Sequence, residues 1–236
     1  MASKTETVSR SLLSVDFLDT HLKHRKKIRD MSKKVSLPLL SAHQLALGAI
    51  ASLQGRVQGK RFENARDEIV QGMFLIAQFV QGIELTETAI SEGLYPQAAN
   101  LLKQELETLA SLEELRLNGS RPDGKTPKFR GSLKGFGKRY GELNELAHPT
   151  RAWIVESLAR YEDGDKAGPT TIPQFNADLY KQSYGNQILF MVKLFGHMEN
   201  LFEDVFNISA DQIEENLIVS VLGILQDEGI IKGVAE

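Results

Sequence analysis

One histidine, His148, stands directly before Pro149 at the end of an amphipathic stretch, RYGELNELAHPTRAW. An imidazole at a helix end can act as a general acid or base, bind a metal ion, or simply close the helix. Glu145 and His148 form a Glu-x-x-His pair, which di-iron helical bundles use in duplicate and with two further glutamates. The chain has no second Glu-x-x-His pair, so we expect no metal site at His148.

Other common kinds of chemistry lack their residues. The sequence has no cysteine, which excludes disulfides, thiolate zinc sites and cysteine nucleophiles. No serine lies in a Gly-x-Ser-x-Gly elbow, residues 55–60 lack the end of a phosphate loop, and no strand precedes the Gly-x-Gly at 135 and 137. His21 and His24 lie one turn apart in a basic run, which we interpret as a solvated face. We therefore expect no cofactor and no metal ligand.

Two basic stretches contain candidate nucleic-acid contacts, the second interleaved with aromatic residues. These candidates are Lys26, Lys27, Arg130, Lys134, Lys138 and Arg139. Basic side chains neutralise phosphates and aromatic rings stack on bases, so this pattern is typical of a surface that binds RNA or DNA. The alternative is a solvated helix face and loop, and the formal net charge of −3 argues against a dedicated nucleic-acid protein.

The elements that must position these residues are helices. Apolar residues recur with a period near 3.6, and no run alternates like a half-buried strand, which predicts an all-α fold. We expect a bundle of about seven helices, over residues 5–35, 39–57, 61–92, 96–118, 133–148, 172–206 and 210–233. Residues 120–132 and 161–171 are predicted to be loops. Capping boxes are expected at three pairs: Ser3 with Glu6, Thr171 with Gln174, and Ser209 with Gln212.

The chain is expected to form a single domain, residues 1–236, with a core over about 61–206. Residues 1–60 and 207–236 are interpreted as helical packing arms. The longest uncharged run, residues 69–83, carries three glutamines and is too short and too polar to span a bilayer. We therefore expect a cytoplasmic protein without membrane contact.

Residues 143–148, LNELAH, end a predicted helix in this all-α chain and resemble the Arg-polar-x-x-x-His motif of the HEPN superfamily. The resemblance extends over residues 61–206 and looks most like a divergent group of prokaryotic HEPN-like helical proteins. Members that are ribonucleases use the arginine and histidine at a dimer interface to cleave RNA without metal. The resemblance thus implies an HEPN-like core and, in a catalytic member, a site at His148 and Asn144.

The sequence departs from the motif where the arginine belongs, because Leu143 occupies that position. A leucine cannot stabilise the negative charge that develops on phosphorus during cleavage. Arg139 and Arg151 flank His148 but not at the motif spacing. We therefore expect a non-catalytic protein that acts through self-association or as a subunit of a larger assembly, in prokaryotic defence or stress response as the resemblance implies. Two alternatives stay open: a metal-independent endoribonuclease, and a nucleic-acid-binding subunit without turnover.

Overall fold

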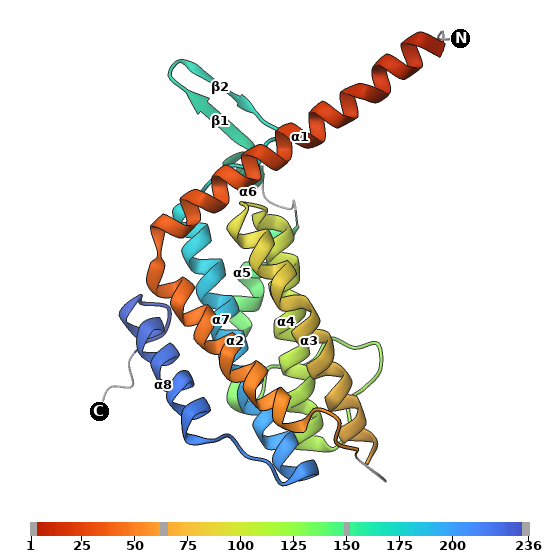
Figure 1. Ribbon diagram of the computed structural model, residues 1–236, viewed down its shortest axis with the longest axis vertical. Coiled ribbons are helices and arrows are strands. Elements are labelled where there is room, and N and C mark those ends of the chain that lie inside the picture. The colour runs from red at the N-terminus through yellow and green to blue at the C-terminus, as the bar shows by residue number, and fades with distance from the viewer. Residues whose placement is uncertain (1–3, 62–65, 149–151, 233–236) are drawn as a thin grey trace.

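The computed structural model describes residues 4–61, 66–148 and 152–232 (Figure 1). Within these ranges the chain forms eight α-helices, a 3-10 turn and one short hairpin, which confirms the all-α prediction. The elements are α1 (Lys4–Val35), α2 (Leu37–Val57), α3 (Asp67–Ser91), α4 (Tyr95–Asn118), η1 (Gly131–Leu133), α5 (Gly137–Ala147), α6 (Ala152–Ala159), β1 (Arg160–Asp163), β2 (Lys166–Pro169), α7 (Ala177–Phe206) and α8 (Gln212–Asp227).

Helix α4 is the central element of the bundle and packs against α3, α5 and α7. Leu102, Leu106 and Leu109 recur at helical spacing and are completely buried. Its ends follow from sequence: Pro96 lies in the first turn, and Gly119 adopts the left-handed conformation (φ 65°) that closes the last turn. Because α4 is buried along its length, it fixes the neighbouring helices relative to one another.

The terminal regions share this core. Helix α2 packs against α7 and α8, and Leu39 and Leu53 of α2 belong to the same buried cluster as Val221 and Leu225 of α8. The outer helix α8 runs along the side of α2 (Figure 1). The segments before residue 60 and after residue 207 thus contain both core helices and an extension, α1.

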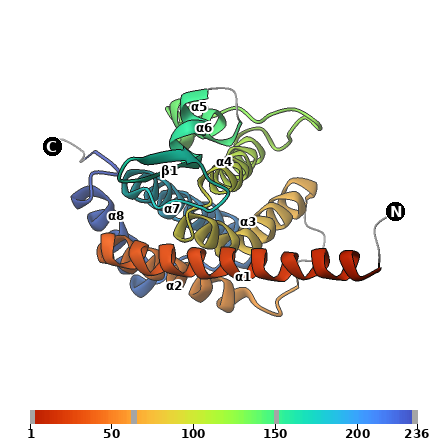
Figure 2. The ribbon, with the colours of Figure 1, turned by 90° about the horizontal axis from the view of Figure 1, so that it is seen from above.

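Helix α1 meets α2 at an angle of 95°. Ser36 accounts for the break, because its hydroxyl accepts a hydrogen bond from the amide of Leu39 and so caps α2. The C-terminal half of α1 docks on the α3–α4 turn: Arg25 Nε lies 2.5 Å from Glu92 Oε2, and Ile28 is 5% exposed. The N-terminal half extends beyond the bundle (Figures 1 and 2).

Several local predictions were wrong. The segment predicted as the start of the fifth helix contains η1, and α5 begins at Gly137. The predicted loop over residues 161–171 contains an antiparallel hairpin, in which Tyr161 pairs with Gly168. Gly164, with φ 59°, allows its tight turn.

Two predicted caps are also replaced. Asn176 caps α7 through a 3.0 Å bond from the Leu179 amide, so Thr171 and Gln174 precede the helix. Asp211 and Glu214 form the capping box of α8. This box lies two residues after the predicted pair, Ser209 and Gln212. Ser3, of the third predicted box, lies outside the described residues.

Helix α3 has the length and apolar composition of a membrane-spanning helix. In this fold it packs against α4 and α7, and Ile76, Phe79 and Ile83 are buried there. The apolar side chains of α3 therefore form one wall of the hydrophobic core.

Candidate functional site

The side chains proposed from the sequence lie on different sides of α5. Leu143 is 4% exposed and belongs to the hydrophobic core, so the position of the expected motif arginine faces inward. Asn144 is half-buried, and His148 is exposed. His148 is the C-cap of α5 in an extended conformation (φ −113°, ψ 136°), as expected for a residue that precedes proline.

A polar seam runs between α4 and α5 beside His148. We define the α4/α5 seam by Lys103 and Glu107 of α4 and Tyr140 and Asn144 of α5. Lys103 Nζ lies 2.9 Å from Asn144 Oδ1, and the Tyr140 hydroxyl donates to Glu107 Oε1 at 2.7 Å. The ammonium group of Lys103 also stands 5.4 Å from the centre of the Tyr140 ring, within range of a cation–π interaction.

The electrostatics of the seam follow from this arrangement. Burial, followed by the hydrogen bond and charge of Glu107, raises the pKa of Tyr140 to about 12, so its hydroxyl stays protonated and acts as a donor at neutral pH. Asn144 lies one turn before His148, the C-cap of α5, and its backbone carbonyl accepts a hydrogen bond from the His148 amide. Lys103 of α4 therefore places a cation beside Asn144, one helical turn before His148, although the expected arginine position supplies none.

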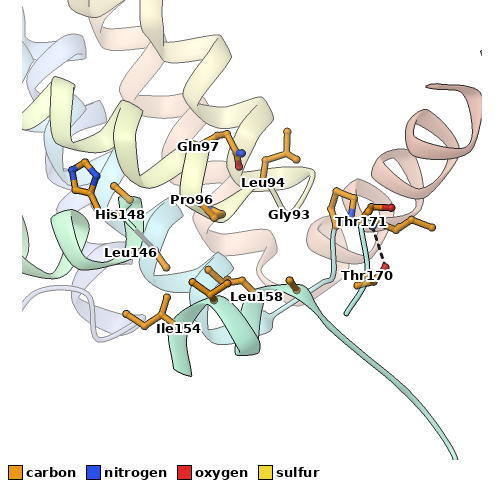
Figure 3. A pocket seen from close by; sticks show the side chains of 15 residues that line it. Gly93, Leu94, Pro96, Gln97, Leu146, His148, Ile154, Leu158, Thr170 and Thr171 are labelled. Atoms are coloured by element: carbon orange, nitrogen blue, oxygen red, sulfur yellow. Dashed lines mark hydrogen bonds between the residues drawn. The ribbon is translucent and has the colours of Figure 1, made fainter. Parts of the chain in front are cut away.

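His148 stands at one end of a cavity of about 390 Å³ (Figure 3). Leu94 and Pro96 lie on one side of this cavity, and Ile154 and Leu158 of α6 lie on the other. His148 therefore marks the point where a polar seam meets an apolar slot.

Arg139, the flanking arginine that the structure describes, is bonded to other parts of the fold. The Arg139 guanidinium donates to Asn186 Oδ1 and, at 3.0 Å, to the backbone carbonyl of Ile230. Arg151 lies outside the described residues. Sequence reasoning missed Lys103, whose signal is a polar row at positions 100, 103 and 107 of α4 beside the buried leucine row.

The remaining predicted nucleic-acid residues fall into two separate groups. Lys26 and Lys27 are exposed on α1, whereas Arg130, Lys134 and Lys138 are exposed around η1 and the start of α5. Helices α1 and α5 lie on opposite sides of the bundle (Figure 2), so the two groups do not form one surface.

The aromatic residues of the second basic stretch, Phe129, Phe136 and Tyr140, pack against other aromatic side chains of the fold. The Phe129 ring packs on Tyr140 at 5.2 Å between centroids, and Phe136 packs on Phe190 at 6.2 Å. All three aromatic side chains of this stretch are half-buried, which limits the surface that they can offer to stacked bases.

Two further histidines are buried rather than available for surface chemistry. Burial lowers the pKa of His43 and of His197 to about 4 in each case. His43 stacks on Tyr184 with ring centroids 5.3 Å apart, and His197 Nε2 lies 3.9 Å from Glu113 Oε2. Among the described residues, no group of three or more His, Asp or Glu side chains is placed to hold a metal ion.

A second candidate surface is the N-terminal part of α1. We define the α1 arm as residues 12–22, which carry six large apolar side chains between 54% and 63% exposed. They are Leu12, Leu13, Val15, Phe17, Leu18 and Leu22. At about 100° per residue they cover more than half of the helix circumference, with Val15, Leu18 and Leu22 on one side and Leu13 and Phe17 on another. Exposed apolar side chains gathered on one element mark interaction surfaces.

No protein-family model, curated protein or solved structure matches this chain. Its function is therefore inferred from these two surfaces.

Proposed function

We propose that the protein acts through self-association, in which the α1 arm of one copy packs against the α1 arm of a second copy. The observation that carries the proposal is the exposure of six large apolar side chains on a helix that projects from the bundle (Figure 1). A single contact between two arms buries only the side chains that face the partner helix, so the interface is smaller than a standard one and the pair should dissociate on dilution.

The periodicity of α1 supports packing against another helix. Val15, Leu18 and Leu22 follow the three-four spacing of helix pairs. The same row continues into Arg25, Arg29 and Ser32, which dock on this chain's own α3–α4 turn: Arg29 Nη2 bonds to Thr88 Oγ1 at 3.1 Å, and the Ser32 hydroxyl to the Ser91 carbonyl at 2.9 Å. The α3–α4 turn covers the polar part of this row, and the α1 arm of a second copy would cover the apolar part.

The charges on the arm favour an antiparallel pair. Asp16 and Asp19 precede Lys23 and Lys26 along α1, so antiparallel arms bring the acidic part of each near the basic part of the other. A parallel pair would align like charges, which is unfavourable. The antiparallel arrangement also places the two bundles at opposite ends of the pair, where they do not collide.

The test is the mass of the full-length protein in solution, measured by light scattering after size-exclusion chromatography over a range of concentrations. We expect a dimer that dissociates on dilution, and a monomer for the double variant Leu18→Glu/Leu22→Glu. Thr20→Glu adds one such charge on the opposite side of the helix and serves as the control that retains the dimer. A wild type that is monomeric at every concentration would remove the proposal.

A second candidate function is favoured by one observation, the placement of Lys103 beside Asn144. We propose metal-independent RNA cleavage at the α4/α5 seam, with Lys103 providing the positive charge for the phosphate and His148 moving a proton. This candidate, like the first, keeps the HEPN-like core and the prokaryotic defence or stress setting as hypotheses.

Its test is cleavage of labelled single-stranded RNA in the presence of a chelator. Removing either group should lower the rate by about a hundredfold or more, so His148→Ala and Lys103→Met should both be nearly inactive. His24→Ala and Lys60→Met change exposed residues of the same types elsewhere and should cleave like the wild type. Absence of cleavage, or equal cleavage by His148→Ala, excludes this candidate.

A further inference from the structure

The cavity at His148 has the form of an apolar slot beside α6, which we call the α6 slot. Its volume of about 390 Å³ lies in the range of small-molecule sites. Leu94 and Pro96 form one wall, while Ile154 and Leu158 form the other (Figure 3). Polar side chains stand at its margins, with His148 at one end and Thr170 at the other (Figure 3).

Helix α6 is poorly packed for an element of the fold. Among its described residues only Ile154 is buried, at 8% exposure. Besides the α6 slot, cavities of about 390 Å³ and 310 Å³ also adjoin this helix. A helix of eight residues does not hold its shape without packing, and protein interiors are normally close-packed. An apolar occupant of the slot would supply the contacts that α6 lacks.

The residues that line the slot indicate which class of ligand it can bind. The described residues around the slot include no Asp, Glu, Lys or Arg and no Phe, Tyr or Trp. Without a formal charge or an aromatic ring, the slot offers little to a multiply charged ligand or to a stacked base. Aliphatic walls, with His148 as a polar side chain at one end, suit a hydrocarbon chain that ends in one hydrogen-bonding group.

We propose that the α6 slot binds a medium-length aliphatic molecule with a single polar head group, such as a straight-chain carboxylate. The chain lies between the α3–α4 turn and α6, and the head group lies at the His148 side. This site is separate from the α1 arm. It shares His148 with the chemistry proposed for the α4/α5 seam, but binding of an aliphatic chain requires neither RNA cleavage nor self-association.

The experiment is calorimetric titration of the full-length protein with hexanoate, octanoate and decanoate. Affinity should rise about fourfold for each added methylene, the ratio that corresponds to burying one such group. Ala159→Leu adds carbon atoms at a residue that lines both the slot and the neighbouring cavity, and should weaken decanoate binding about tenfold or more, because a packed site resists added volume. Ala152→Leu, at an exposed position of α6 outside the slot lining, should bind like the wild type.

Hydrogen exchange gives a readout that is independent of the variants. Decanoate should slow exchange of the α6 amides in the wild-type protein, since α6 gains packing. Three results would each overturn the proposal: no binding of any of the three carboxylates, equal weakening of decanoate binding by Ala159→Leu and Ala152→Leu, or slowed amide exchange confined to the α1 arm. Should Ala159→Leu not fold, the chain-length series and the α6 exchange rates of the wild type still decide it.

Discussion

The guanidinium group of Arg139 on α5 donates a hydrogen bond to the backbone carbonyl of Ile230, 3.0 Å away and beyond the end of α8. The same group donates to Asn186 on α7, and the side chain of Ile230 packs against Gly185 of α7. A residue that the sequence suggested for nucleic-acid binding thus joins α5 and α7 to the C-terminal segment.

This junction predicts opposite effects for two glycines of α7. A Cβ atom at Gly185 would lie 2.5 Å from Ile230 Cδ1, whereas nothing stands within 4 Å of one at Gly196. Gly185→Ala should lower the free energy of unfolding by about 1–3 kcal/mol through overpacking, while Gly196→Ala should raise it by about 0.5–1 kcal/mol through helix propensity. Urea denaturation measures both, and equal stability of the two variants would contradict the close contact.

The link between α2 and α8 gives a second prediction. Arg56 Nη1 lies 2.7 Å from Glu214 Oε2, and that carboxylate has no exposed side-chain surface. Arg56→Met should cost about 1–3 kcal/mol of stability, because it removes the cation from a buried carboxylate that keeps only its bonds to Ser52 and to the Asp211 amide.

The matched control is the exposed pair of Lys23 and Asp19 on α1, 2.6 Å apart. Lys23→Met should leave the urea midpoint unchanged, since the side chains of Lys23 and Asp19 are both solvated. A similar loss in both variants would show that burial of Glu214 does not govern the strength of the α2–α8 link.

The sequence predicted what depends on local periodicity and on helix ends. The leucine row of α4, Pro96 in its first turn and Gly119 at its end are all local signals, and the structure has all of them. The hairpin was missed because β1 and β2 have four residues each and show no apolar alternation. Capping pairs recur by chance, so the Thr171 and Ser209 patterns competed with the caps that tertiary structure selects.

The candidate site depended on information that spacing does not contain. The motif pattern drew attention to Asn144 and to His148, which follows it by four residues at the end of α5. Lys103, however, lies 41 residues before Asn144, and their contact depends on how α4 and α5 pack. In the sequence, Leu143 occupies the position where the motif has an arginine. In the fold, Leu143 is a core residue, and the positive charge beside Asn144 comes from Lys103 of α4.

Acid stability should depend on His43. Burial lowers its folded-state pKa to about 4, below the ordinary value of 6.5, so the unfolded chain takes up this proton first. The group therefore stabilises the fold above pH 6.5, and its contribution is lost as the pH falls from 6.5 towards 4. His43→Phe, which can keep the stack on Tyr184, should flatten the decline measured by urea denaturation across that window. His24→Phe, at an exposed position of α1, is the control that should keep it.

Glu105 should produce the opposite dependence. Burial raises its pKa from 4.5 to about 8, and the hydrogen bond from the Thr86 hydroxyl opposes that rise only in part. Folding therefore takes up a proton between these values, so the contribution of this group is full below pH 4.5 and is lost as the pH rises to about 8.

Glu105→Gln keeps an acceptor for Thr86, 2.6 Å away in the wild type, but cannot ionise. It should match the wild type near pH 4.5 and exceed it at pH 9 by on the order of 5 kcal/mol, at about 1.4 kcal/mol for each unit of the rise from 4.5 to about 8. The exposed Glu84→Gln on α3 is the control and should follow the wild-type curve. Parallel curves for wild type and Glu105→Gln in urea denaturation from pH 4.5 to 9 would mean that Glu105 is already ionised in the folded protein at neutral pH.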